Sequence, residues 1–492
     1  MPLSKSNYLN YLRHPAWLWL ALHDKQRLPP VDAATQALFD AGHEFEPYAE
    51  MLWPGGVTLG WNPADFGSYN TLPARTERAI LNQTPVIFQG RLEVEGLTAI
   101  FDVLERVNDQ TFDLYEIKSS TRVKDEHLLD LAFQARLLEL AGYTVRKIGV
   151  THVNSQYVRQ GDIDASRLCR TVDVTEEVKC RREQTIAQIA AALEVAAQPD
   201  CPDLSPRFAA SFGFSEWLKV YGYLHPDLPA DSIYRLTHPS ARLIGELEDA
   251  GLTHLADIPD TFSLSAAQRR QVDAARSGRT VDQTRLTDWL SRLEYPLYFL
   301  DYETAGKLIP PFDGMRPYEA IPFQYSLHVV DTPGAAPRHL EYLHDSPTDM
   351  MTPLVTHLRA DIGPAGSIIV WSQSFEKGCH IRMASHLPEH ADWLLALNDR
   401  VVDLMIPFAA GWFTDPAFVG SASIKKILPV LVPDLSYKDL AIHEGGTAQQ
   451  TWMSTILDGQ NPDHRNQILT DLRQYCALDT LAMVEIYKFL SI

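Results

Sequence analysis

The stretch that most constrains the fold is Leu297–Thr304, in which a run of apolar and aromatic residues leads directly into Asp301 and Glu303. The run over residues 297–300 predicts a buried strand with the two acids at its end. Residues two apart on a strand point to the same face, so the two carboxylates stand side by side. Such acids repel each other unless a cation lies between them, and hard divalent ions favour oxygen ligands. A strand that ends in two solvated acids is the alternative that this stretch alone leaves open.

The length and composition of the chain limit its class. At 492 residues it is too long for one hydrophobic core, and two or three domains are expected. No apolar run is long enough to span a bilayer and the N-terminus has no signal-peptide core, so we expect a cytoplasmic protein with no membrane partner. The five cysteines form no CxxC pair, which argues against a disulfide framework or a zinc site. The net charge of −20 argues against wholesale coating of nucleic acid, but not against an enzyme that reaches phosphates through bound metal and a local basic groove.

Hydrophobic periodicity predicts a mixed α/β fold in several parts. Residues 1–60 predict helices, 86–118 short strands, 125–142 a helix, 145–153 a strand and 175–197 a long helix, before a Pro-rich boundary at 198–203. Strands return at 297–300, 323–330 and 367–371, and the last helix covers 463–490.

The part between, over residues 203–290, is mostly helical and contains the most basic local segment. Its arginines are Arg269, Arg270, Arg276, Arg279 and Arg285. A solvated helix face is the favoured interpretation, and a nucleic-acid contact is the alternative.

A first group of candidate site residues follows the early strands. Asp102 ends an apolar run, and Glu116 and Lys118 close the next strand on one face, after a short hairpin. Two acids and a lysine at such strand ends can hold Mg²⁺, polarise a scissile phosphate and orient an attacking water. Gln134, on the following helix, can support the lysine or the water. A surface hairpin with ordinary charges is the alternative.

The segments around these residues, 101–104, 114–120 and 132–138, resemble the PD-(D/E)XK nucleases of the RecB type, a branch that includes the CRISPR adaptation exonucleases. The resemblance implies that Asp102 and Glu116 bind metal, that Lys118 is the catalytic lysine and that Gln134 is the helix glutamine. His43 is the nearest candidate for the family's upstream histidine ligand, and Leu138 stands where the family has a tyrosine. The cysteines that hold an iron–sulfur cluster in many relatives are missing, so no cluster is expected.

A second group of candidates lies in the C-terminal part. Glu376 lies near the start of a helix, where the helix dipole favours an acid even without metal. Tyr475 and Asp479 are four apart on the last helix, a spacing that also occurs in ordinary half-buried packing. Together with Asp301 and Glu303, these residues supply four carboxylates and a phenol. Such a set can hold two metal ions about 3.5–4 Å apart, the arrangement that clamps both oxygens of a phosphodiester.

The order D-x-E, F-[D/E] at a helix start and Y-x3-D resembles the DEDDy branch of the ribonuclease-H-like 3′→5′ exonucleases. The resemblance implies that Asp301, Glu303 and Asp479 bind two Mg²⁺ or Mn²⁺ ions and that Tyr475 positions the nucleophile. Glu376 takes the place of the aspartate in the second motif. Asp403 is the fallback ligand, and its other interpretation is a helix cap.

Through the segments 298–304, 321–328, 374–377, 420–426 and 475–483, the whole chain resembles a bacterial family of unassigned role that fuses these two nuclease-like halves, the second being a domain of unknown function. The resemblance implies a PD-(D/E)XK restriction-endonuclease-like domain over 1–200, a helical linker or nucleic-acid-binding segment over 201–290, and a ribonuclease-H-like domain over 291–492. The expected function is a metal-dependent nuclease, with exonuclease action favoured and DNA ahead of RNA, that acts in DNA processing, repair or defence. One alternative is that only one half cuts. Another is a non-catalytic nucleic-acid-binding or assembly scaffold with degenerate sites, against which the retained acids and Lys118 count.

Overall fold

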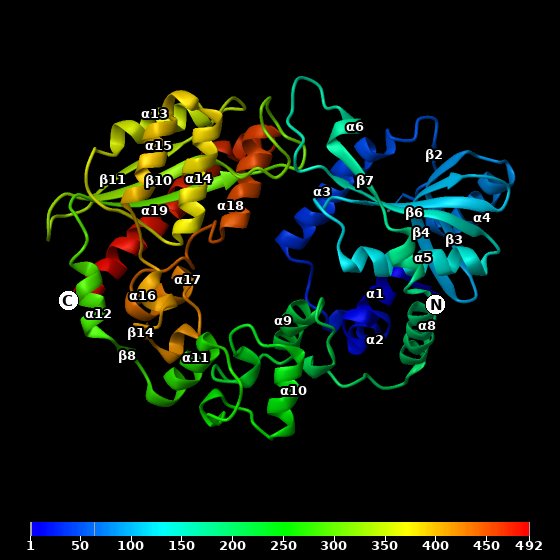
Figure 1. Cartoon of the computed structure of the whole chain (residues 1–492), viewed down its shortest axis with the longest axis horizontal. Coiled ribbons are helices and arrows are strands. Elements are labelled where there is room, and N and C mark those ends of the chain that lie inside the picture. The colour runs from blue at the N-terminus through cyan, green and yellow to red at the C-terminus, as the bar shows by residue number, and fades with distance from the viewer. Residues whose placement is uncertain (1, 63, 492) are drawn as a thin grey trace. The chain divides into compact units, whose positions relative to one another are not determined.

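The computed structural model describes residues 2–62 and 64–491, and the chain forms two compact units, each described by itself (Figure 1). Unit 1 comprises Met1–Leu228 with Ser240–Glu246, and unit 2 comprises Pro229–Pro239 with Leu247–Ile492. The fold is mixed α/β, as predicted, with an N-terminal mixed sheet curled into a half-barrel, a helical middle and a C-terminal mixed sheet. The three domains expected from the sequence stay predictions.

The N-terminal sheet has the strand order β2-β3-β4-β5-β6-β7, and β1 pairs in parallel with β4. Its strands are β1 (Leu3–Ser4), β2 (Val57–Thr58), β3 (Val86–Val94), β4 (Leu97–Arg106), β5 (Thr111–Lys118), β6 (Thr144–Val153) and β7 (Cys169–Asp173). Neighbours β3, β4 and β5 are antiparallel, whereas β5 and β6 are parallel. The parallel pair requires a crossover, which α5 (Asp125–Leu140) supplies.

Helix α5 contacts β3, β4, β5 and β6, and α1 (Lys5–Arg13) and α8 (Arg182–Ala197) pack on α5. The other helices of this part are α2 (Pro15–His23), α3 (Ala33–Glu50), α4 (Phe66–Leu81), α6 (Ala165–Leu168) and α7 (Thr175–Lys179). The prediction of one long helix over 175–197 is wrong, because α7 ends before Cys180 and α8 begins at Arg182. No glycine or proline marks this break in the sequence.

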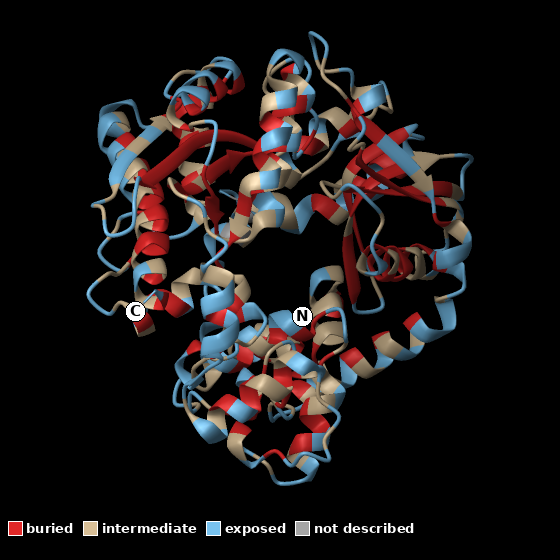
Figure 2. Cartoon of the chain, turned by 60° about the vertical axis from the view of Figure 1, so that its left-hand side comes forward, coloured by how far each residue is buried: buried red, intermediate tan, exposed pale blue. Residues whose placement is uncertain are grey.

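The C-terminal sheet has the order β11-β10-β9-β12-β13, with β9 at its centre. Its strands are β9 (Leu297–Ala305), β10 (Ile321–Val330), β11 (Arg338–Leu343), β12 (Ile368–Val370) and β13 (Val401–Asp403). Strand β9 is antiparallel to β10 and parallel to β12. Nearly every residue of β9 and β10 is buried, which explains their long apolar runs, and Figure 2 shows burial concentrated in the strands of both sheets.

Two of the predicted strand ends are wrong, and both errors concern acids. Asp301 and Glu303 lie inside β9, because its pairing with β10 continues beyond them to Ala305. Asp102 likewise lies in the middle of β4 instead of at its end. Buried carboxylates need a hydrogen-bond partner, an opposite charge or a metal ion. An acid in the middle of a strand therefore points to such a partner rather than to the end of the strand.

Helices cover both faces of the central strand β9. Tyr302 points to one face, where its hydroxyl lies 3.1 Å from Nε2 of His380 on α14 (Gln373–His386). Asp301 and Glu303 therefore point to the opposite face, where α19 (Arg465–Leu490) packs against β9, β10 and β11. The remaining helices of this part are α13 (Met351–Asp361), α15 (Ala391–Leu397), α16 (Ile406–Ala409), α17 (Ile424–Leu431) and α18 (Gly445–Trp452). The alternation along β9 thus directs the two acids toward the last helix.

The middle of the chain is mostly helical, as predicted, with α9 (Phe214–Leu224), α10 (Ala241–Asp249), α11 (Ala266–Ser277) and α12 (Gln283–Leu290). A small sheet pairs β8 (Thr280–Val281) with β14 (Phe413–Thr414). Arg269 and Arg276 both pair with Asp260, and Arg270 donates to the carbonyl of Ala409. These arginines hold neighbouring segments of unit 2, and a nucleic-acid contact for them stays a prediction. Among the described residues, no helix is both long and apolar enough to cross a bilayer.

Candidate functional site

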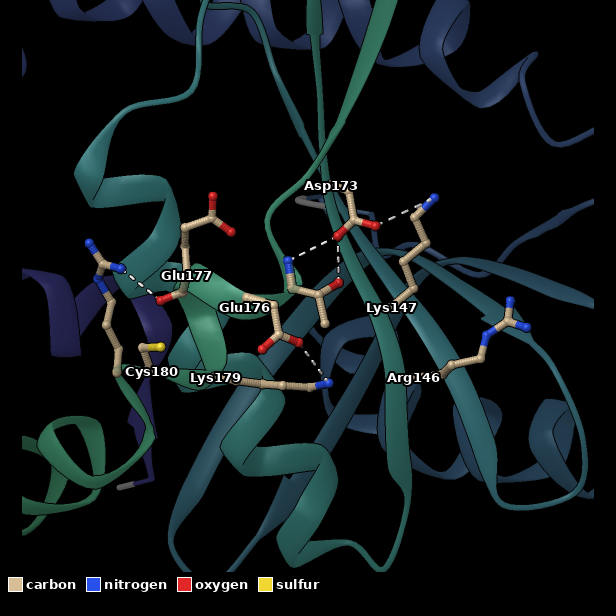
Figure 3. Close-up of a pocket in the computed structure, with 9 residues that line it drawn as sticks. Arg146, Lys147, Asp173, Glu176, Glu177, Lys179 and Cys180 are labelled. Carbon is tan, nitrogen blue, oxygen red and sulfur yellow. Dashed lines mark hydrogen bonds and ion pairs between the residues drawn. The ribbon is translucent and has the colours of Figure 1, made fainter.

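A pocket of about 980 Å³ lies beside β6 and α7, and none of the predicted site residues line it (Figure 3). Its lysines and arginines are already paired with acids. Arg146 pairs with Asp113, and Lys147 lies 4.0 Å from Asp173. Lys179 and Arg181 have partners as well, in Glu176 and Asp125. Each lysine and arginine of this pocket thus has an acidic partner, and the residues singled out from the sequence lie elsewhere.

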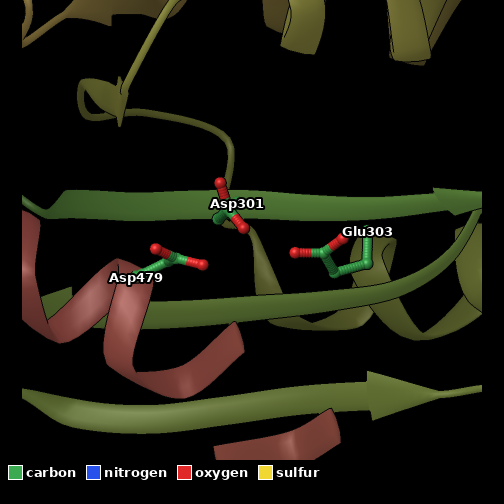
Figure 4. Close-up of side chains that lie close together, drawn as sticks. All are labelled: Asp301, Glu303 and Asp479. Atoms are coloured by element: carbon green, nitrogen blue, oxygen red, sulfur yellow. The ribbon is translucent and has the colours of Figure 1, made fainter. Parts of the chain in front are cut away.

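The acids of the C-terminal part meet where β9 faces α19. Figure 4 shows Asp301 and Glu303 projecting from the strand toward Asp479 on the helix. One carboxylate oxygen from each of the three residues lies within 4.8 Å of the others. Glu303 and Asp479 are buried and Asp301 is nearly so. The structure thus brings together three of the acids expected from the sequence, Asp301, Glu303 and Asp479, and their binding of metal stays a prediction.

The electrostatics of this cluster show an excess of negative charge. Burial raises the pKa of Asp301 and of Glu303 well above their usual values, and the charges of neighbouring acids raise them further. Burial also raises the pKa of Asp479 to about 6, although hydrogen bonds from Tyr437 and Tyr475 and the charge of Lys425 oppose the shift. A divalent cation is the partner that such a set of oxygen donors fits.

Glu376, in the first turn of α14, is another buried acid whose carboxylate is not fully hydrogen-bonded. It is only 1% exposed, and its Oε2 atom has no hydrogen-bond partner among the described residues. Burial and the charges of Asp301 and Glu303 raise its pKa well above the usual value. An unsatisfied buried carboxylate oxygen is costly unless something binds it. A role for Glu376 as a fourth metal ligand stays a prediction, because the oxygens that lie within 4.8 Å of one another belong to Asp301, Glu303 and Asp479.

Asp403, the fallback ligand, has a different set of partners. Its Oδ1 accepts the backbone N–H groups of Ser372 and Met405, each at 3.0 Å, and its Oδ2 accepts that of Gln373 at 2.9 Å. The bonds from Ser372 and Gln373 satisfy the start of α14, where Ser372 has a left-handed backbone with φ of 77°. The geometry is that of a cap which positions the helix carrying Glu376. A ligand role for Asp403 stays a prediction that this geometry does not favour.

Tyr475 lies at the edge of the acid cluster. It is 3% exposed, and its hydroxyl bonds to Asp479 and accepts a hydrogen bond of 3.2 Å from Lys425. Lys425 also donates to the carbonyl of His443 at 2.8 Å, which fixes its ammonium beside the phenol. Tyr437 donates to Oδ1 of Asp479 at 2.6 Å.

Two of these residues, Lys425 and Tyr437, are absent from the sequence prediction. Lys425 lies in the segment 420–426, which carries the whole-chain resemblance, so a sequence clue for it existed. Tyr437 has no such clue, because no motif contains it.

The acids of the N-terminal part form a separate cluster inside unit 1. Lys118 Nζ lies 2.7 Å from Glu116 Oε1, and Gln134 Nε2 donates to Glu116 Oε2 at 2.6 Å. Asp102 Oδ2 accepts the backbone N–H of Ile117 at 2.8 Å. The structure thus brings together Asp102, Glu116, Lys118 and Gln134, as the sequence predicts.

This cluster has two charged members that the sequence analysis missed. Lys5 on α1 lies 2.9 Å from Glu116 Oε1, and Asp130 on α5 accepts from both Lys118 and Gln134. Asp130 stands four residues before Gln134 on one helix face, a spacing that the sequence displays. His43 is exposed on α3, and the prediction that it binds metal is not tested. Its helix neighbour Glu46 lies near enough to Glu116 for the charge of Glu116 to raise its pKa, in addition to the larger effect of burial.

We expect the metal-free protein to lose stability between about pH 4 and pH 7 through the C-terminal cluster. Folding raises the pKa of Asp479 to about 6, so the protonated carboxyl stabilises the folded state. This stabilisation is fully present below the pKa of the unfolded chain and is lost as the pH rises through 6. The loss should be on the order of 1–3 kcal/mol. Calorimetric melting in EDTA should show a falling unfolding temperature, and Mn²⁺ at pH 7.5 should restore it. Asp479→Asn should flatten this slope, and an unchanged slope in that variant would contradict the assignment.

Comparisons with known proteins locate the chain among uncharacterised sequences. Residues 298–423 match the profile of a domain of unknown function, DUF2779. Over 136 residues the chain is 29% identical to the uncharacterised protein MG366 of Mycoplasma genitalium, a match that covers 25% of this chain and 20% of that protein. The homologue of MG366 in Mycoplasma pneumoniae is 27% identical over 221 residues, which cover 41% of this chain and 33% of the relative. The chain thus spans a third or less of the relatives' length, and the DUF2779 match includes Asp301, Glu303 and Glu376 but ends before Asp479.

Proposed function

We propose that this protein is a divalent-metal-dependent nuclease whose principal centre is the C-terminal acid cluster. The observation that carries the proposal is the convergence of Asp301, Glu303 and Asp479 within 4.8 Å, deep in a fold with little positive charge to balance them. Burying three neighbouring acids costs stability without a cation. A protein that only needed this sheet to fold would gain by replacing them with apolar residues.

The residues of the site supply distinct roles in this proposal. Asp301, Glu303, Glu376 and Asp479 would hold Mg²⁺ or Mn²⁺, which when bound supplies electrostatic stabilisation of the phosphodiester oxygens and a more acidic water. Tyr475, fixed between Asp479 and Lys425, presents a phenol that orients a water at the edge of the cluster. A ribonuclease-H-like fold for this part and a PD-(D/E)XK-like fold for the N-terminal part belong to the same proposal. Nucleic acid, with DNA ahead of RNA, is the proposed substrate.

The test is degradation of end-labelled nucleic acids by the full chain. Single- and double-stranded DNA and RNA, labelled at the 5′ end, would be incubated with Mg²⁺, Mn²⁺ or EDTA. We expect metal-dependent shortening from the 3′ end, and Asp301→Asn in a Lys118→Ala background should abolish it. The matched control is Asp331→Asn, because Asp331 is exposed on the loop after β10 and lies outside the cluster. No metal-dependent cleavage of any of the four substrates would refute the proposal and favour the scaffold alternative.

A further inference from the structure

The N-terminal acid cluster contains two lysine ammonium groups that pair directly with its acids. Two ammonium groups, from Lys5 and Lys118, lie 2.9 and 2.7 Å from the same oxygen of Glu116. The other oxygen of Glu116 accepts from Gln134 at 2.6 Å. Asp130 lies 3.2 Å from Lys118 and 3.9 Å from Lys5. Burial opposes ionisation of Glu116, but the charges of Lys118 and Lys5 lower its pKa below the usual value.

Lys5 is fixed in this place by the fold. The residues before it form β1, which pairs in parallel with β4, the strand that carries Asp102. Ser4 caps α1 by accepting the backbone N–H of Asn7 at 3.2 Å, and Lys5 is the first residue of that helix. One turn later, the fully buried ring of Tyr8 stacks on Phe133 of α5 at 5.0 Å between centroids. The side chain of Lys5 is 20% exposed, far less than a surface lysine.

One atom beside the cluster still lacks a partner. Gln134 is fully buried, and its amide nitrogen donates to two carboxylates, Glu116 and Asp130. This use of the nitrogen fixes the orientation of the amide, because exchanging N and O would place an acceptor against two acids. Its Oε1 atom then has no hydrogen-bond partner among the described residues. This buried acceptor is one that a donor or a cation could satisfy.

We propose that Lys5 is a resident counter-cation of the N-terminal cluster, and that Lys5 and a divalent metal ion bind Glu116 in alternation. The resemblance to PD-(D/E)XK nucleases implies that Asp102 and Glu116 hold metal, and their carboxylates suit a divalent ion, but both oxygens of Glu116 are already occupied by two ammonium groups and an amide. Binding of metal therefore requires the Lys5 ammonium to leave Glu116. The inference concerns unit 1 alone and does not depend on activity of the C-terminal centre.

The first test follows Lys5 directly in the otherwise native sequence. Reductive methylation of lysines, read by peptide mass spectrometry, reports how freely each ammonium reacts. We expect Lys5 to react slowly without metal and at least about 5-fold faster with saturating Mn²⁺, a change that corresponds to release of a charge-paired ammonium. The exposed Lys25 should react at one rate in both conditions. An unchanged Lys5 rate in the presence of Mn²⁺ would overturn the alternation.

The second test measures metal affinity and stability. It uses an Asp301→Asn, Glu303→Gln background, which removes two proposed ligands of the C-terminal cluster, and compares Lys5→Met with Lys25→Met. Lys5→Met should lower the unfolding temperature in EDTA by on the order of 5–10 °C, because buried acids lose a partner. Mn²⁺ should restore the loss and bind at least about 10-fold tighter than in the parent, since a competing positive charge is gone.

A loss that Mn²⁺ does not restore, with affinity unchanged or weakened, would make Lys5 a purely structural lysine and overturn the inference. If Lys5→Met does not fold, Lys5→Arg replaces it and should keep the weak Mn²⁺ affinity of the parent, because it keeps the charge. Tighter binding in Lys5→Arg would also overturn the inference. None of these measurements depends on nuclease activity. A failure of the proposed nuclease function is therefore distinguishable from a failure of the Lys5 inference.

Discussion

Replacing Glu376 by glutamine should reduce metal-dependent cleavage by on the order of 100- to 1,000-fold while making the metal-free protein more stable. Both effects follow from the same feature, a buried carboxylate whose Oε2 has no partner and whose pKa is raised by burial and by Asp301 and Glu303. Glutamine removes the charge that would hold metal, and it also removes the repulsion within the cluster. Glu376→Asp should keep activity within about 10-fold, because a carboxylate remains to bind metal.

Asp403→Asn is the matched variant for this experiment. It also replaces a buried carboxylate by an amide, at the end of β13. Its carboxylate accepts two backbone N–H groups at the start of α14 and a third from Met405, so its loss should cost about 0.5–2 kcal/mol of stability with a milder effect on rate. All variants carry Lys118→Ala so that the N-terminal cluster contributes no cleavage. Rates on labelled DNA and melting in EDTA are the measurements. An inactive Asp403→Asn beside an active Glu376→Gln would reverse the assignment of the two acids.

Lys425→Met should lower kcat by about 10- to 100-fold, with little change in KM, through its effect on Tyr475. The ammonium donates to the Tyr475 hydroxyl at 3.2 Å and is anchored on the carbonyl of His443, so it sets the direction of the phenol. Lys425 also lowers the pKa values of Asp301 and Asp479 against the larger effect of burial. Its removal should therefore move the acid limb of the pH–rate profile to higher pH.

The next residue in the chain provides the control for this prediction. Lys426 is exposed on α17, whereas Lys425 is half-buried, so Lys426→Met removes the same charge from the chain without touching the site. Lys425→Arg should recover most of the pH profile, because it restores the charge. A structural role alone would lower stability in Lys425→Met but leave the position of the acid limb unchanged, and that result would contradict a positioning role.

The parts of both clusters that could be predicted from the sequence are those that local spacing brings together. Asp301 and Glu303 share a strand face, and Tyr475 and Asp479 share a helix face, so period alone places each pair. The partnership of Lys5 with Glu116 spans 111 positions, and no local pattern connects a helix start to a strand so far away. The pairing of β1 with β4 and the packing of Tyr8 on Phe133 create it.

The predicted strand ends failed for a related reason. A polar residue after an apolar run normally marks the point where a strand leaves the core. In β9 the pairing runs past Asp301, and opposite it Ser326 of β10 is also buried and polar. The sequence pattern therefore predicted the end of a strand at Asp301, although β9 and β10 stay paired beyond this residue. Whether a buried acid interrupts a strand depends on neighbours from distant segments, which a single sequence does not reveal.

The interleaving of the two units determines how their functions can be separated. Residues 229–239 belong to unit 2 and residues 240–246 to unit 1, so the chain passes from one unit to the other three times. Helix α10, Ala241–Asp249, contains residues of both. Any single truncation would leave one half without a segment and the other with a superfluous one. Deletion fragments would thus confuse a lost activity with an incomplete fold, and the two centres must be dissected by point substitutions in the intact chain.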